Sequence, residues 1–318
     1  MSPRDNFRAI LVTIIWGANF VVIDEGLKGF PPFLLLSARF LLVVFPLIFF
    51  IPRPGPWRQI LLIGTFMSFG QFTLLYLALH LGMPTGLASL LVQAQVIFTI
   101  AISAAVLGER PTRHQLAGVG LGVTGLSVLV LGRGANTPLG PLAITVAACL
   151  AWAIGNVLAR RSRISSGLGL TIWSGIVVPI PALALAFMIN GSAEIGHAVS
   201  HIGALTIFSI LYTVLGASLF GYGTWNSLLS RYPVSSVVPF TLIVPVAGIT
   251  TAWIVLGQAP TLAETVGGIV LLAGVATATL LPAAARPDAS SADPCQASAP
   301  REPQPRDSRL SPSPASPA

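Results

Sequence analysis

The chain has 318 residues, of which 54% are hydrophobic and only 8% are charged. Soluble domains carry about one quarter charged residues, so this composition excludes a soluble globular protein and predicts an integral membrane protein. The formal net charge of +7 would favour a nucleic-acid partner in a soluble protein. Here the arginines lie in short segments beside apolar stretches, so we expect a lipid bilayer and no nucleic acid as the partner.

Ten apolar stretches follow one another along the chain. Each is close to the roughly 20 residues that a membrane-spanning helix needs. They cover residues 8–25, 33–51, 59–80, 86–107, 115–131, 140–159, 169–189, 204–229, 234–256 and 263–282. These stretches are too long for strands, so the predicted fold class is an all-α polytopic membrane protein with ten transmembrane helices.

The arginines predict how the chain is oriented. With the N-terminus inside, the inner segments contain most of the basic residues, which is the positive-inside pattern. These residues are Arg4, Arg8, Arg53, Arg58, Arg110, Arg113, Arg160, Arg161, Arg163 and Arg231. An even number of helices then places both termini in the cytoplasm.

An internal repeat divides the apolar part of the chain. Residues 106–112 (VLGERPT) recur 149 positions later as residues 255–261 (VLGQAPT). Membrane carriers are commonly built from two related halves around a central site. Five helices per half is an odd number, so the halves are expected to cross the membrane in opposite senses. Arg110 becomes Ala259 in the second copy, as a copy on the outer side requires.

The repeat gives the predicted domains. Residues 1–132 are the first repeat with helices one to five, and residues 138–282 are the second repeat with helices six to ten. Residues 283–318 are rich in Pro, Ser and Ala and lack the apolar residues that folding requires. We expect a disordered cytoplasmic tail there.

Several motifs carry a resemblance to a known family. They are WGANFVV at 16–22, GMPTGLASL at 82–90, LGER at 107–110 and LIVPV at 242–246. In this order the chain resembles an EamA-type member of the drug/metabolite transporter superfamily, closest to the cysteine and O-acetylserine exporter branch, over about residues 5–282. The resemblance implies ten helices in two inverted five-helix repeats, a bacterial inner-membrane location and export of amino acids or related metabolites. One departure is Gln258, where relatives often repeat an acidic residue.

Polar side chains inside the spans are the candidates for a substrate cavity, because a polar group in hydrocarbon is costly and usually faces the bundle interior. An amide both donates and accepts hydrogen bonds, which suits a ligand with an ammonium and a carboxylate. The candidate amides are Asn19, Gln71, Gln93, Gln95, Asn156 and Asn226. Interhelical hydrogen bonds worth about 0.6 kcal/mol are the alternative role for each. Gln93 and Gln95 are two residues apart, so we expect one to line the cavity and the other to pack helices.

Aromatic residues are the candidates for the cavity wall, with anchoring at the membrane interface as the alternative. Tyr76 and Trp225 are related by the 149-residue offset and lie on the third and eighth predicted helices. Repeat partners are expected to face one central axis. Tyr222 is included with them as a candidate.

Five residues are candidates for gating. Arg39 is expected at the outer end of the second helix, where it either extends to the lipid headgroups or attracts a substrate carboxylate. Glu109 and Arg110 form either a cytoplasmic gate pair or a structural turn. Pro239 and Pro245 fall within the ninth helix and are expected to bend it.

The predicted function is facilitated export of a small amino acid or related metabolite by alternating access, since every acidic residue lies near a predicted helix end or in the tail. The alternatives are a multidrug or other metabolite carrier and, in a different class, a membrane receptor or an intramembrane enzyme. No catalytic constellation is apparent, and His197 and His201 lack a third metal ligand, so we expect neither an enzyme, a metal nor a cofactor.

The oligomeric state is open at this point. Glycines on the fifth and tenth predicted helices allow close helix approach. They either form the face of a homodimer or pack helices within one chain; they are Gly118, Gly122, Gly125, Gly267 and Gly274.

Overall fold

The computed structural model describes residues 1–132, 138–162, 164 and 167–280. The predicted tail, residues 283–318, lies outside the described residues. Every regular element in the described part of the chain is a helix. The predicted all-α class is therefore confirmed.

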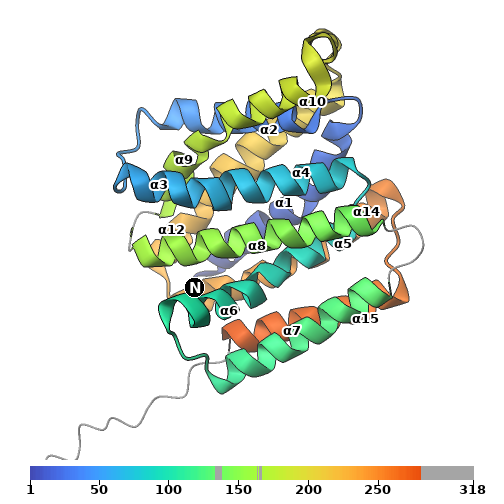
Figure 1. The fold of residues 1–318 in the computed structure, drawn as a ribbon. Coiled ribbons are helices and arrows are strands. Elements are labelled where there is room, and N and C mark those ends of the chain that lie inside the picture. Colours follow the sequence, from blue (N-terminus) through green and yellow to red (C-terminus); the bar gives the residue numbers. More distant parts are fainter. Residues whose placement is uncertain (133–137, 163, 165–166, 281–318) are drawn as a thin grey trace, which may run out of the picture. The chain divides into compact units, whose positions relative to one another are not determined.

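The helical elements of the described chain follow the predicted spans (Figure 1). In chain order they are α1 (Pro3–Leu27); α2 (Pro32–Leu47); α3 (Trp57–Gly64), a π-helical stretch (Thr65–Gly70) and α4 (Gln71–His80); α5 (Thr85–Leu91), a 3-10 turn (Val92–Ala94) and α6 (Gln95–Leu107); α7 (Arg113–Leu131); α8 (Leu139–Ser162); α9 (Gly167–Ser174), a 3-10 turn (Gly175–Val177) and α10 (Pro179–Ser200); α11 (Ala204–Leu211), a π-helical stretch (Tyr212–Tyr222) and α12 (Gly223–Arg231); α13 (Val234–Val237), a 3-10 stretch (Val238–Leu242) and α14 (Ile243–Leu256); and α15 (Leu262–Leu280). Within the described residues, nine helical runs are long and apolar enough to cross a membrane, and α2 is a shorter apolar helix.

The second helix is shorter than its predicted span of 33–51. It has 16 residues and ends at Leu47, just after Pro46. Proline has no N–H to donate, which weakens the last helical turn. Phe49 and Phe50 continue the apolar pattern beyond the helix and are exposed, so hydrophobicity alone overestimates the length of α2.

The two halves share local irregularities at corresponding positions. Shifting the π-helical stretch Thr65–Gly70 by 149 residues places it inside the π-helical stretch Tyr212–Tyr222. The 3-10 turn Val92–Ala94 overlaps the 3-10 stretch Val238–Leu242 in the same way. The sequence repeat therefore extends to the backbone.

The repeated turns also end and begin their helices alike. Gly108 and Gly257 both have a left-handed backbone, with φ of 66° and 68°. In the residues that follow, the backbone N–H groups of Thr112 and Gln115 each donate to the side chain of the other, and those of Thr261 and Glu264 do the same. Each pair is a capping box, which satisfies the free N–H groups at a helix start.

Helices α7 and α15 lie side by side (Figure 1) and meet at glycines. On α7, a Cβ added to Gly118 would lie 2.7 Å from Ala278 Cβ and 2.6 Å from Gly274 O of α15. A Cβ added to Gly125 would lie 2.7 Å from Gly267 O. Small residues permit this backbone approach, which drives helix association in lipid. Because these glycines face each other within one chain, the homodimer face that they could have formed is not available.

Helix α1 runs antiparallel to the helical run Ala204–Arg231. At one end a Cβ on Gly26 would overlap Ser209, and in the middle the Trp16 indole N–H donates to Ala217 O at 2.8 Å. At the other end Asp5 accepts two 3.2 Å hydrogen bonds from the Arg231 guanidinium. These contacts fix the register of α1 against this run.

We expect Gly125→Ala to lower the stability of the protein by about 1–3 kcal/mol, because the added methyl group overpacks the contact with α15. A Cβ there would lie 2.4 Å from Leu271 N. The matched control is Gly120→Ala on the same helix, where no atom lies within 4 Å of the added Cβ. Thermal unfolding in detergent measures both variants, and an equal midpoint for the two would contradict the packing account.

Candidate functional site

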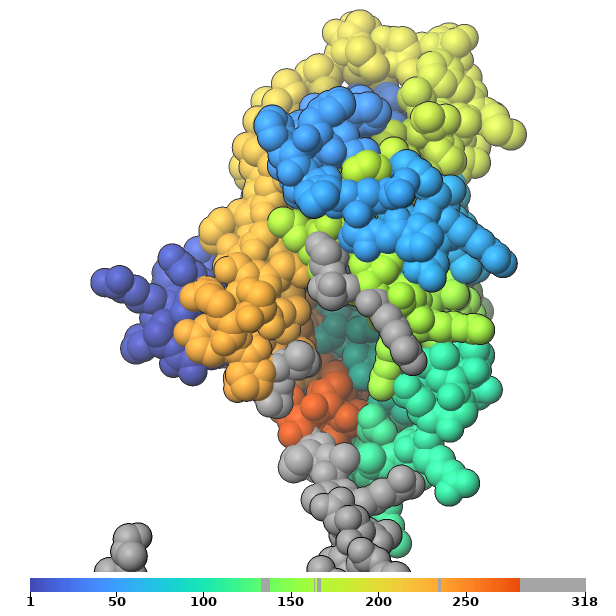
Figure 2. Space-filling model, turned by 90° about the vertical axis from the view of Figure 1, so that its left-hand side faces the viewer, coloured from blue at the N-terminus to red at the C-terminus, as the bar shows by residue number. Residues whose placement is uncertain are grey.

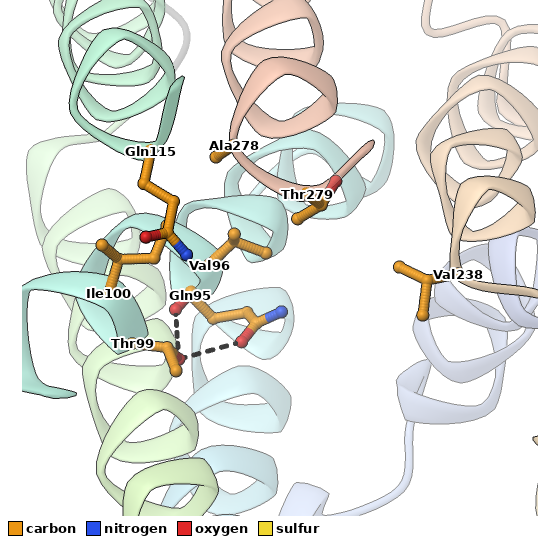
Figure 3. Close-up of a pocket in the computed structure, with 8 residues that line it drawn as sticks. All are labelled: Gln95, Val96, Thr99, Ile100, Gln115, Val238, Ala278 and Thr279. Carbon is orange, nitrogen blue, oxygen red and sulfur yellow. Dashed lines mark hydrogen bonds between the residues drawn. The ribbon is translucent and has the colours of Figure 1, made fainter. Parts of the chain in front are cut away.

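A pocket of about 360 Å³ lies between α6, α7, α15 and the 3-10 stretch that precedes α14. Figure 3 shows the eight residues that line it, and none of them is charged. They are Gln95, Val96, Thr99, Ile100, Gln115, Val238, Ala278 and Thr279. The lining is therefore uncharged and combines four amide or hydroxyl side chains with four apolar ones.

Gln95 is the best-placed polar group in this pocket. Its Oε1 accepts a 2.8 Å hydrogen bond from Asn156 Nδ2, and Thr99 Oγ1 donates to its backbone oxygen at 2.7 Å. In Figure 3 the Gln95 amide nitrogen points away from Thr99 and into the pocket. Among the described residues this nitrogen has no acceptor, so it is available to a ligand. Thr99 was missed in the sequence, although it lies one helical turn from Gln95.

The pocket extends from the middle of the bundle towards one end. Gln95 is the eleventh residue of the 23-residue run Thr85–Leu107. Gln115 lies in the first turn of α7 and Thr279 in the last turn of α15. Figure 2 shows the face at this end hollowed, with α8 and α12 on either side and part of α15 in the depth. This is the end that carries Arg110 and Arg113, which the arginine pattern assigns to the cytoplasm.

The other candidate amides have different surroundings. Gln93 is buried and its Nε2 donates to Thr241 O at 3.5 Å, so it joins two helical runs while Gln95 lines the pocket. Asn226 donates to Tyr222 O within its own helix at 2.8 Å. Asn19 and Gln71 are buried, and neither side chain has a hydrogen-bond partner among the described residues.

Arg39 lies in the interior and not at the outer end of its helix, as the sequence had predicted. It is the eighth of the 16 residues of α2, and only 3% of its surface is exposed. The prediction was wrong because it considered only how close Arg39 lies to the helix end, whereas the side chain packs against Tyr76 and Ser218 of neighbouring helices. Extension to the headgroups is thus excluded in this structure.

Hydroxyl groups and aromatic rings surround Arg39. Its guanidinium donates to Tyr76 Oη at 3.2 Å and to Ser218 Oγ at 3.3 Å. It also lies 4.6 Å from the ring centre of Phe72 and 5.5 Å from that of Phe40. These residues come from α2, from α4 and from the π-helical stretch Tyr212–Tyr222 of the run Ala204–Arg231, which is the eighth helical run along the chain. Three helical runs therefore meet at the Arg39 guanidinium.

The remaining aromatic candidates form a cluster with Trp16, in which Tyr222 also interacts electrostatically with Arg39. Trp16 contacts Tyr222 with 5.6 Å and Trp225 with 5.2 Å between ring centres. Tyr76 is not part of this cluster, since it is fully buried beside Arg39. The repeat partners Tyr76 and Trp225 therefore occupy different surroundings.

The predicted gate pair of Glu109 and Arg110 is not formed. Glu109 makes its ion pair with Arg160 at 3.1 Å, which links the loop before α7 to the end of α8. Neighbouring residues that leave a helix through a left-handed glycine need not face each other, so adjacency in sequence was a poor guide. The corresponding residue in the second half, Gln258, instead accepts hydrogen bonds from Thr85 N and Thr85 Oγ1 at 3.2 Å. It thereby caps α5.

The two candidate prolines lie where the helical run Val234–Leu256 departs from α-helix. Pro239 is in the 3-10 stretch Val238–Leu242, and Pro245 is in the first turn of α14. The first half also has a 3-10 turn at Val92–Ala94, without a proline. Proline is therefore not required for the break, although the stretch with Pro239 is longer.

Comparison with known proteins identifies the chain. A model of the EamA-like transporter family matches residues 6–131 and again residues 139–280. The chain belongs to the EamA-like transporter family. A relative named probable amino-acid metabolite efflux pump, from Salmonella typhimurium, is 40% identical over 282 residues, which cover 86% of this chain and 94% of the relative.

Two further relatives are more distant. A probable terminal-alkyne amino-acid exporter from Streptantibioticus cattleyicolor is 27% identical over 84% of this chain and 90% of its own length. An uncharacterized inner membrane transporter from Escherichia coli, YedA, is 28% identical over 49% of this chain and 53% of its own. A solved crystal structure has the same fold, with a TM-score of 0.60 and 20% identity over 88% of this chain and 98% of that one.

Membership of this family decides the class of activity. The chain is a multi-pass inner-membrane transporter of the EamA-like family and not an enzyme. The two family matches coincide with the two predicted repeats. The uncharged pocket and the buried Arg39 are therefore features of a transporter interior.

The pocket geometry predicts one-sided access. In a protein whose own cysteines Cys149 and Cys295 are replaced, Thr99→Cys should react with a membrane-impermeant maleimide in inside-out vesicles, because Thr99 lines the pocket. Ser103→Cys is the matched control, since Ser103 lies one turn away on α6 and is buried. Faster labelling of Thr99→Cys in right-side-out vesicles would contradict the inferred opening.

Proposed function

We propose that this protein exports amino acids or closely related small metabolites, of the cysteine and O-acetylserine type, by alternating access through its interior. The observation that carries the proposal is the uncharged pocket with the unpaired Gln95 amide nitrogen. Its size suits a small ligand, and amide and hydroxyl groups can bind both an ammonium and a carboxylate. The names of the 40% and 27% identical relatives support the same class of substrate.

The absence of charge in the pocket bears on the alternatives. A lipophilic cation needs an acidic counter-charge, and proton-coupled carriers usually keep an ionisable group in the membrane. None of the eight pocket residues is acidic. This favours a zwitterionic substrate and facilitated export over a multidrug carrier.

We further infer that the two halves are an inverted pair. Gly118 of α7 faces Gly274 of α15, while Gly125 faces Gly267. The offset of 149 residues makes Gly267 the repeat partner of Gly118 and Gly274 that of Gly125. Exchanging the two halves therefore turns the first contact into the second. Two antiparallel helices with reciprocal contacts are related by a two-fold axis perpendicular to them. Such an axis lies in the membrane plane, as in inverted-repeat carriers.

The difference between the two ends supports alternating access. At one end Gln258 caps the start of α5 through Thr85. At the other end its repeat partner Glu109 is paired with Arg160 and the pocket opens. We propose that the opposite state breaks the Gln258 contact and closes the other end by an approach of the Glu109 loop to the start of α13. No second copy of the chain is needed for this movement, so the homodimer stays unsupported by the glycine contacts.

Export by living cells tests the proposed substrate class. Overproduction should protect a bacterial host against toxic amounts of cysteine-pathway amino acids and raise their concentration in the medium. We expect Gln95→Leu to reduce the excretion rate about tenfold, because the substrate loses hydrogen bonds in the pocket. Asn190→Leu is the control, since that amide bonds Glu194 outside the pocket. Protection against lipophilic cations alone would favour the multidrug alternative and contradict the proposal.

Facilitated export gives a prediction for purified protein. In proteoliposomes the protein should exchange labelled against unlabelled amino acid without a pH gradient. A zwitterion carries no net charge, so a membrane potential should not alter its equilibrium distribution. Accumulation of substrate driven by a pH gradient alone would contradict facilitated export.

A further inference from the structure

We propose that Arg39, held by Tyr76 and Ser218, is the subsite that binds the carboxylate of the transported amino acid. The inference rests on the proposed export of amino acids and names the group that recognises them. Its observations are separate from those of the Gln95 pocket.

The charge of Arg39 has no counter-charge in the described chain. The described ion pairs join Asp5 to Arg8 and Arg231, Glu25 to Lys28, and Glu109 to Arg160, and none includes Arg39. Arginine does not lose its proton in proteins. A permanent cation is thus 97% buried, in the middle of a membrane helix, beside neutral groups only.

Some N–H groups of the Arg39 guanidinium have no acceptor among the described residues. It carries five N–H groups, and the two described hydrogen bonds use one on Nη1 and one on Nη2. The Nε atom is buried and has no hydrogen-bond partner. Nε–H and a neighbouring Nη–H point in parallel, which is the arrangement that binds both oxygens of a carboxylate. The two used donors fix the plane of the group, so the free edge is already oriented.

The energetics favour an anion beside Arg39 at some stage of the cycle. Charged side chains inside a membrane are costly and commonly mark the path of a substrate or ion. The hydroxyls of Tyr76 and Ser218 and the face of Phe72 lower this cost,. They are neutral, however, so a carboxylate would still gain a charge-assisted bidentate contact, which is the stronger kind of hydrogen bond.

A candidate group for the substrate ammonium lies on α1. Ser218 is the fifteenth residue of the 28-residue run Ala204–Arg231, and its neighbour Ala217 accepts the Trp16 indole N–H. Asn19 follows Trp16 by one helical turn on α1, and its buried Oδ1 has no partner. The unpaired Asn19 Oδ1 thus lies on α1, which packs against the run Ala204–Arg231 near Ser218. Arg39 and Asn19 together offer one cationic and one accepting group, which match the two charges of a zwitterion.

A purely structural role of Arg39 makes a different prediction. In that case the residue only ties α2 to α4 and the eighth run, and its loss harms every substrate equally. A carboxylate subsite instead predicts a loss of selectivity between an amino acid and its carboxamide. We therefore compare S-methyl-L-cysteine with S-methyl-L-cysteine amide as probes.

The experiment uses the full-length chain in proteoliposomes and measures how well each probe competes for exchange. Wild-type protein should prefer the acid, and Arg39→Gln should reduce the acid-over-amide ratio about tenfold or more, since hydrogen bonds to a charge are lost. Arg58→Gln is the control, because Arg58 is exposed on α3. Should Arg39→Gln fail to fold, Tyr76→Phe keeps the charge but loosens its orientation and should reduce the ratio to a smaller degree. An unchanged ratio in the variant that folds overturns the subsite.

Failure of the proposed function is distinguished by a second measurement. Wild-type protein that exchanges no amino acid refutes the proposed substrate. Thermal unfolding in detergent with propanoate or propionamide then tests Arg39 alone. Stabilisation of the wild-type protein by propanoate only, lost in Arg39→Gln or weakened in Tyr76→Phe, supports the carboxylate subsite. Equal effects of the two probes on the wild-type protein reject it.

Discussion

Close approach between helix backbones is the constraint on which the rest of this structure depends. Lipid tails are as apolar as the helix surfaces, so apolar burial gives little reason for helices to associate in a bilayer. The contacts of Gly118 with Gly274 and of Gly125 with Gly267 bring α7 and α15 together without intervening side chains. Gly17 does the same for α1 against α14, where a Cβ would lie 2.5 Å from Val244 O. Because these glycine contacts hold the helices together, polar groups can occupy the interior of the bundle.

The polar groups inside the bundle fall into two kinds. Thr145 and Thr213 are fully buried or nearly so, and each donates to a carbonyl of its own helix, which satisfies the hydroxyl without any ligand. Asn19 Oδ1, Arg39 Nε and Gln95 Nε2 have no such partner among the described residues. An unpaired polar group costs free energy in a medium without water. Ser209 Oγ is also unpaired but belongs to the close contact with Gly26, so an unpaired group marks a binding site only together with its surroundings.

The sequence predicted the parts of this fold that depend on hydrophobicity and on the repeat. The spans, the duplicated glycine turns and the opposite directions of Gln93 and Gln95 are of this sort. Which of the two faces the pocket depends on the rotation of α6 after the 3-10 turn Val92–Ala94, and no local pattern encodes that rotation. The burial of Arg39 depends on contacts with Tyr76 and Ser218, and the partner of Glu109 lies on α8, far along the chain. Such contacts arise only when the helices pack.

The central claim is that the two ends of the bundle open in turn. Spin labels placed in pairs on exposed repeat partners test it most directly, one pair at Leu81→Cys and Ala259→Cys and the other at Ser230→Cys and Arg110→Cys, with Cys149 and Cys295 replaced. The account predicts that adding a transported amino acid lengthens the 81–259 distance in a fraction of the molecules. In the same fraction the 230–110 distance should shorten. Distances that stay unchanged, or that lengthen together, would contradict it.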